Sequence, residues 1–175
     1  MPGSVIQINR APVLTLWASV VAERLGFEPD EALSLGKAMA GLTAQSKGRR
    51  LGVYKRRYTK DGHPAPKHGL GEEFWVELCG RTVPAQETDD GVRAVVKDQP
   101  VDPEKTTAYL KQKFGDDLAR VRKAMEKLAC AHDLDELSEI AFALYEKFRP
   151  AIPPGRRGWG AKGDLDLAQI RRMAR

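Results

Sequence analysis

The fold is organised around the stretch Val13-Leu14-Thr15-Leu16-Trp17-Ala18-Ser19-Val20-Val21-Ala22-Glu23-Arg24-Leu25. Apolar residues dominate it, and polar side chains recur four residues apart at Thr15, Ser19 and Glu23. This spacing places one narrow polar stripe on an otherwise apolar helix. We therefore expect a largely buried helix in which Trp17 is the largest anchor.

A second helix is expected directly after the first, from Pro29 to about Gln45, because Gly26 is a natural stop and Pro29 suits a first turn. Small residues recur on it every four positions and form a flat face that lets another helix approach closely: Ala32, Gly36, Ala40 and Ala44. The short link predicts that the two helices are antiparallel or crossed neighbours.

The remaining chain indicates a small antiparallel sheet followed by more helices. Residues 74–79 alternate in hydrophobicity like a strand, which we expect to continue beyond Gly80, and Asp90-Gly91 is a turn signal before a return strand at 92–96. Two or three strands are expected. Caps at Asp102 and Asp133 predict helices within 103–149, and a last short helix is expected behind Asp164.

These patterns predict a mainly α fold with a small antiparallel β-sheet, of the α+β class. We expect one globular domain over residues 1–149, followed at 150–175 by a tail rich in Pro, Gly and Arg that carries the short helix. Within the domain the expected order is a helix pair (11–45), a basic loop or strand (46–71), a β-hairpin (72–97) and helical hairpins (103–149).

Charge is segregated along the chain, although the net charge is only +5. Residues 47–68 hold eight cations and one acid, and residues 150–175 hold six cations and two acids. The segment between them, 69–149, holds twelve cations and seventeen acids. Two basic segments thus flank an acidic one, and local fields of this kind attract anionic partners.

The basic stretch Ser46-Lys47-Gly48-Arg49-Arg50-Leu51-Gly52-Val53-Tyr54-Lys55-Arg56-Arg57-Tyr58-Thr59-Lys60 is the strongest functional candidate, with seven cations and no acid. Lysine and arginine neutralise phosphates, and tyrosines stack on unpaired bases. The second basic segment offers Arg156, Arg157 and Lys162 as a second wall. The predicted nucleic-acid-binding residues are Lys47, Arg49, Arg50, Tyr54, Lys55, Arg56, Arg57, Tyr58, Lys60, Arg156, Arg157 and Lys162.

The leading hypothesis is a non-enzymatic protein that binds DNA or RNA with little sequence preference. A helix-turn-helix reader is disfavoured because the second helix carries a single cation, Lys37, between Glu31 and Gln45. One alternative is a protein-interaction or homodimerisation module, in which the acidic middle of one copy meets the basic stretch of another. A second alternative is an enzyme or a protein that binds a small phosphate ligand between Lys47 and His68.

No catalytic, cofactor or metal site is assigned. The histidines and cysteines lack the tight repeated spacing of zinc ligands, and no phosphate-binding loop or nucleophile elbow is present. Whether the chain is an enzyme stays open, with the non-enzymatic interpretation favoured. The lack of a long apolar run and of an export signal predicts a cytoplasmic protein that does not enter a membrane.

Three segments resemble the opening of a group of small uncharacterised bacterial proteins: Asn9-Arg10-Ala11-Pro12-Val13-Leu14-Thr15-Leu16-Trp17, Val21-Ala22-Glu23-Arg24-Leu25-Gly26-Phe27 and Ser46-Lys47-Gly48. The resemblance covers about the first third of the chain. It implies a bacterial cytoplasmic protein and carries over no activity or functional residue.

Overall fold

The computed structural model describes residues 5–44, 73–97, 99–152 and 162–174. The chain order of the elements is β1 (Val5–Asn9), α1 (Arg10–Arg24), α2 (Pro29–Ala44), β2 (Glu73–Leu78), β3 (Arg81–Thr88), β4 (Gly91–Val96), β5 (Gln99–Pro100), α4 (Pro103–Phe114), a 3-10 turn (Gly115–Asp117), α5 (Leu118–Cys130), α6 (Leu134–Phe148), β6 (Lys162–Asp166) and α7 (Leu167–Met173). Helices with small antiparallel sheets confirm the predicted α+β class.

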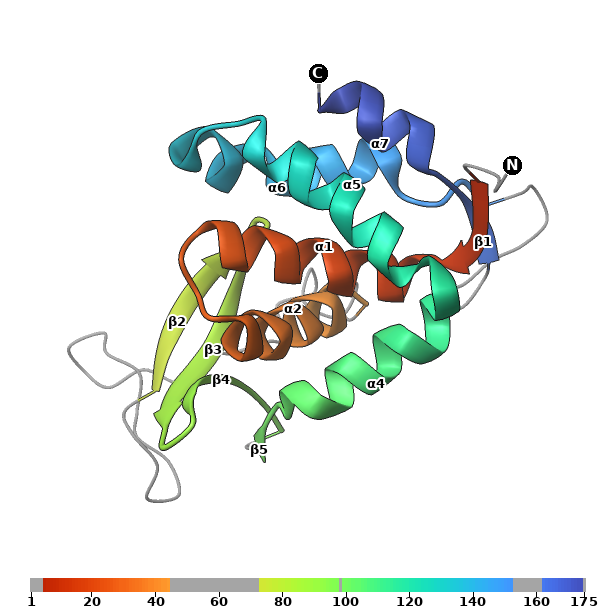
Figure 1. Cartoon of the computed structure of the whole chain (residues 1–175). Coiled ribbons are helices and arrows are strands. Elements are labelled where there is room, and N and C mark those ends of the chain that lie inside the picture. Colours follow the sequence, from red (N-terminus) through yellow and green to blue (C-terminus); the bar gives the residue numbers. More distant parts are fainter. Residues whose placement is uncertain (1–4, 45–72, 98, 153–161, 175) are drawn as a thin grey trace.

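Helix α1 is the centre of the core. Figure 1 shows it between α2 on one side and α5, α6 and α7 on the other. Residues 12–22 are all buried, as the sequence predicted for this helix. The Trp17 indole donates through Nε1 to the carbonyl of Ala141 at 2.9 Å and meets the ring of Phe148 edge to face at 5.3 Å. The indole therefore ties α1 to α6.

Thr15 and Ser19 of the polar stripe bond within α1 and lie against α2, whereas Glu23 pairs with Arg122 on α5. Thr15 Oγ1 donates to the carbonyl of Ala11, and Ser19 Oγ donates to that of Thr15, both at 2.9 Å. A Cβ added at Gly36 would lie 2.3 Å from Ser19 Oγ and 2.8 Å from Thr15 O. Glycine at this position therefore allows the close approach of the two helices that the small-residue face predicted.

The larger sheet has the strand order β2-β3-β4-β5 and is antiparallel throughout. It has more strands than the two or three expected, and the strand did not continue past Gly80. Leu78 pairs with Arg81, so Cys79 and Gly80 form a two-residue turn, with φ of +50° and +77°. Positive φ at both positions matches the twist of a tight hairpin. The expected turn before Gly91 is confirmed.

A serine on α2 fastens this helix to the sheet. Ser34 Oγ donates to the carbonyl of Val101 at 2.7 Å and accepts from the backbone N–H of Ala94 at 2.9 Å. Glu31, one turn earlier, accepts from the N–H of Val92 at 2.8 Å. These bonds fix the N-terminal half of α2 against β4.

The two ends of the described chain pair with each other. Strand β1 runs antiparallel to β6, with Ile6 opposite Leu165 and Asn9 opposite Lys162. Ile6, Ile8, Leu165 and the α7 residue Ile170 join the core. The segment that we described from the sequence as a tail thus supplies a strand and a helix to the body (Figure 1).

The start of the last helix was placed wrongly by the sequence. Asp166, and not Asp164, caps α7, its side chain accepting from the N–H of Ala168 at 2.9 Å. Asp164 lies inside β6, where its backbone bonds to Ala151. The strand is too short and too polar for its sequence alone to separate it from a loop. By contrast, the caps Asp102 and Asp133 are confirmed.

Among the described residues, none of the helices combines the length and the apolar character that crossing a membrane requires.

Candidate nucleic-acid interface

Most of the predicted binding residues lie outside the described part of the chain. This holds for Lys47, Arg49, Arg50, Tyr54, Lys55, Arg56, Arg57, Tyr58, Lys60, Arg156 and Arg157. Lys162 is described: it is the first residue of β6, and its side chain is exposed. What the structure does describe is the scaffold at which the two basic segments begin and end.

Three of the four described residues that flank the basic segments, Ala44, Ile152 and Lys162, lie at one end of the molecule. The fourth, Glu73, starts β2 and pairs with Gln86 near the β3–β4 turn, so the first segment returns to the scaffold at the other end of α2. Helix α2 ends at Ala44, three residues before Lys47, the first cation of the first segment. Because α2 returns antiparallel along α1, with Gly36 against Thr15 and Ser19, Ala44 lies toward the start of α1. In the second segment, Lys162 follows Arg156 and Arg157 and is paired with Asn9, the residue immediately before α1. Figure 1 shows these chain ends around the N-terminus of α1.

The chain that leads into the second segment is fastened at the same end. Ala151 forms a bridge with Asp164, through backbone bonds of 3.1 and 3.0 Å. A Cβ added at Gly163 would lie 2.4 Å from the carbonyl oxygen of Ala151, so glycine is required there. Ile152 and Lys162, which lie on either side of residues 153–161 in the second segment, are therefore held close to each other.

Two arginines that the sequence did not single out lie at this end. Arg10 opens α1, and its Nε donates to the carbonyl of Pro150 at 3.0 Å. Arg149 precedes that proline at the end of α6. Partial burial lowers the pKa of Arg10, and the neighbouring charge of Arg149 lowers it further. The sequence contained one signal for Arg10: it is a cation in the first turn of a helix whose first turn holds no acid.

Some arginines of the described chain are paired with its carboxylates, and those at the start of α1 are not. Arg122 forms a salt bridge with Glu23, and Arg120 forms one with Asp117 at 2.8 Å. Within the described ranges, no salt bridge involves Arg10, Arg149 or Lys162. Their positive charge is thus not cancelled by a carboxylate of the described chain.

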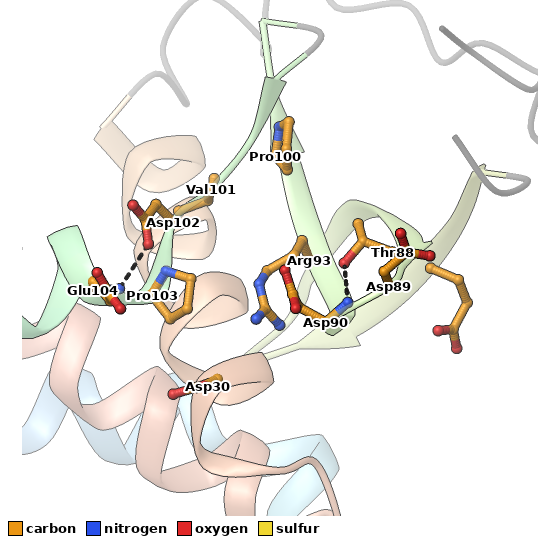
Figure 2. A pocket seen from close by; sticks show the side chains of 11 residues that line it. Asp30, Thr88, Asp89, Asp90, Arg93, Pro100, Val101, Asp102, Pro103 and Glu104 are labelled. Atoms are coloured by element: carbon orange, nitrogen blue, oxygen red, sulfur yellow. Dashed lines mark hydrogen bonds between the residues drawn. The ribbon is translucent and has the colours of Figure 1, made fainter. Parts of the chain in front are cut away.

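The opposite end of α2 carries the opposite charge. A cavity of about 1010 Å³ opens between the start of α2, the β3–β4 turn and the start of α4. Figure 2 shows the carboxylates around it and the side chain of Arg93 among them. Its acidic lining residues are Asp30, Glu87, Asp89, Asp90, Asp102 and Glu104. Since α2 has 16 residues, about 24 Å of helix separates this acidic cavity from Ala44.

The cysteines offer little nucleophilic chemistry. Cys79 is buried in the β2–β3 turn, and burial raises the pKa of its thiol far above neutral pH. It is therefore a protonated thiol and a weak nucleophile. Cys130 is exposed at the end of α5. His63 and His68 lie outside the described residues. In the part of the chain that the structure describes, no group of three His, Cys, Asp or Glu side chains is placed to hold a metal ion.

Comparisons of the chain with protein-family models, with curated proteins and with solved structures found no match.

Proposed function

We propose that this protein binds nucleic acid without catalysing a reaction, through phosphate contacts with little sequence preference. The contacts come from the cations between Lys47 and Lys60 and from Arg156, Arg157 and Lys162. Tyr54 and Tyr58 stack on unpaired bases. A further part of the proposal, from the N-terminal resemblance, is that binding takes place in the cytoplasm of a bacterium.

One observation carries the proposal: the first basic segment leaves the scaffold at the same end at which the chain on both sides of Arg156 and Arg157 is fastened. Ala44 and Lys162 lie there, at the start of α1, together with Arg10 and Arg149. This shared starting point favours a single basic surface formed by the cations nearest to it, although the first segment returns to the scaffold at Glu73, at the other end of α2. The carboxylates of the acidic cavity, at the far end of α2, repel a polyanion and so favour its approach to the basic end.

The proposal is tested by the affinity for mixed-sequence DNA and RNA oligonucleotides over a salt series. We expect the logarithm of the affinity to fall steeply with the logarithm of the salt concentration, by about 0.9 for each phosphate contacted on duplex DNA. Oligonucleotides of equal length and different sequence are expected to bind alike. Absence of binding at low salt, or an affinity that ignores salt, would contradict the proposal.

A second candidate function, homodimerisation, is favoured by the acidic cavity, which complements the basic stretch of another copy in charge. It is tested by the molar mass in solution at low and high salt. The informative variant neutralises four exposed carboxylates of the cavity and spares the cap Asp102: Asp30→Asn, Glu87→Gln, Asp89→Asn and Asp90→Asn. A dimer of the natural chain that is lost in this variant would support dimerisation. If the protein binds nucleic acid, the variant should bind oligonucleotides at least as tightly as the natural chain does, because it has lost only negative charges.

A further inference from the structure

Three positive features converge at the start of α1. Arg10 is the first residue of the helix, and its bond to the carbonyl of Pro150, of 3.0 Å, brings the end of α6 and Arg149 beside it. The third feature is the N-terminus of α1 itself. Its first turn contains no acidic residue, and the Asn9 side chain makes no capping hydrogen bond. The partial positive charge of the helix end therefore adds to the two guanidinium groups.

The described neighbours do not neutralise these charges. Tyr145 donates its hydroxyl to the Arg10 carbonyl at 3.5 Å, and burial raises its pKa to about 12, so the phenol is uncharged at neutral pH. Asp164 accepts a bond from Gln7. Glu146 on α6 forms no salt bridge with Arg149 among the described residues, and the C-terminus of α6 offers Arg149 only a partial negative charge.

Each feature alone has an ordinary structural explanation, since Arg10 binds a carbonyl and Arg149 ends a helix. Together they are unfavourable, because burial and the charge of Arg149 both lower the pKa of Arg10. The positive end of α1 adds to the repulsion between the two guanidinium groups, and the negative end of α6 offsets part of it. An anion that accepts hydrogen bonds from both guanidinium groups removes the repulsion. Phosphate suits this arrangement, since its oxygens match the paired N–H groups of arginine.

We infer that Arg10 and Arg149 form a phosphate-binding site at the N-terminus of α1. The inference rests on the proposed function and deepens it: the site is a fixed phosphate contact on the scaffold, at the end where α2 leads into the first basic segment and where Ile152 and Lys162 are held together. In that setting the phosphate belongs to the backbone of the nucleic acid. A free phosphate or a phosphorylated small molecule has the same chemistry, and the experiment separates these sources.

The first arm of the test uses inorganic phosphate and thermal unfolding. The natural chain is compared with Arg149→Gln, which keeps the backbone cap of α6, with Arg149→Lys, which keeps the charge, and with the control Lys123→Gln, which removes an exposed cation on α5. Each protein is titrated with phosphate against chloride at equal ionic strength. Every Tm is referred to the same protein in chloride, because the variants differ in intrinsic stability.

We expect phosphate to raise the Tm of the natural chain and of Lys123→Gln alike. In Arg149→Gln the half-saturating phosphate concentration should rise about tenfold, which is the typical effect of losing one hydrogen bond to a charged group. The half-saturating phosphate concentration of Arg149→Lys should lie between those of the natural chain and of Arg149→Gln, because lysine retains the charge and loses the fork geometry. Equal protection of Arg149→Gln and of the natural chain by phosphate would overturn the inference.

The second arm uses a mixed-sequence oligonucleotide and distinguishes failure of the inference from failure of the proposed function. If Arg149→Gln lowers the salt slope by about 0.9 and Lys123→Gln does not, the site contacts the nucleic-acid backbone. A different outcome is that phosphate protection depends on Arg149 while neither the natural chain nor any variant binds the oligonucleotide. The site then binds free phosphate, and the proposed function is wrong. If the natural chain binds the oligonucleotide and Arg149→Gln matches Lys123→Gln in both arms, the proposed function stands and the inference falls.

Discussion

Replacing Arg49, Arg50, Arg56 and Arg57 together with alanine is expected to flatten the salt dependence of nucleic-acid binding by up to about 3.6 in the logarithmic slope. Each of these arginines neutralises one phosphate in the proposed complex, and each contact displaces about 0.9 counterion on duplex DNA. The affinity at low salt should fall by several orders of magnitude, while the Tm stays unchanged. Binding titrations over a salt series measure both the slope and the affinity.

A second quadruple variant separates the position of these charges from their number. Lys105, Lys111, Lys123 and Lys127 are exposed on α4 and α5, and their replacement by alanine also removes four positive charges from a net charge of +5. The proposed interface does not include them, so the slope should stay near that of the natural chain. An equal loss in both variants would mean that net charge alone attracts the nucleic acid and would remove the site assignment.

Replacing Gly36 with alanine is expected to have the largest effect on stability. The new Cβ would lie 2.3 Å from Ser19 Oγ and 2.8 Å from two backbone atoms, the N of Ser19 and the O of Thr15. A rotamer change relieves the first clash only, so α1 and α2 must separate and the packing between them is lost. The free energy of unfolding should fall by about 3 kcal/mol, which is at the upper end of overpacking effects. In a chain of this size it lowers the Tm by about 6–12 °C.

Gly41 provides the matched control for this substitution, because it lies on the same helix and a Cβ there would meet no atom within 4 Å. Gly41→Ala should stabilise the protein by about 0.5–1 kcal/mol, since alanine favours the helix over glycine. Thermal unfolding of the two variants tests the prediction. A Gly36→Ala protein with the same Tm as the natural chain would contradict the close approach of α1 and α2.

The sequence was most informative where a local pattern decides the structure. The apolar run around Trp17 became a fully buried helix, and the small residues around Gly36 became the face on which α1 lies. Helix caps were found wherever a capping side chain precedes a clear apolar repeat, as at Asp102 and Asp133. In these cases the interaction that forms the element joins residues only a few positions apart.

The sequence was least informative where the partner is distant. Strand β1 has only five residues, and it pairs with β6, which lies more than 150 residues later in the chain. The alternation of buried Ile6 and Ile8 with exposed Val5 and Gln7 was a usable signal for a strand, but it does not name the partner. Asp164 was taken for a helix cap for the same reason, because its backbone bonds reach back to Ala151.

The candidate site shows the same division. The charge runs and their tyrosines are visible in the sequence, and their assignment as a nucleic-acid interface stays a prediction. The pairing of Arg10 with the end of α6 depends on the tertiary fold, since 140 positions separate Arg10 from Pro150. The acidic cavity likewise gathers carboxylates from three separate elements, α2, the β3–β4 turn and α4. Spacing along the chain indicates neither grouping.

The central claim is that the cations of residues 47–60 and of residues 156–162 form one nucleic-acid-binding surface near the start of α1. Backbone hydrogen exchange, compared with and without a saturating mixed-sequence oligonucleotide, tests it most directly. The account predicts slower exchange in peptides covering residues 45–72 and 149–163 and unchanged exchange in those covering residues 87–104 at the acidic cavity. Slower exchange at the acidic cavity, or in only one of the two basic segments, would contradict it.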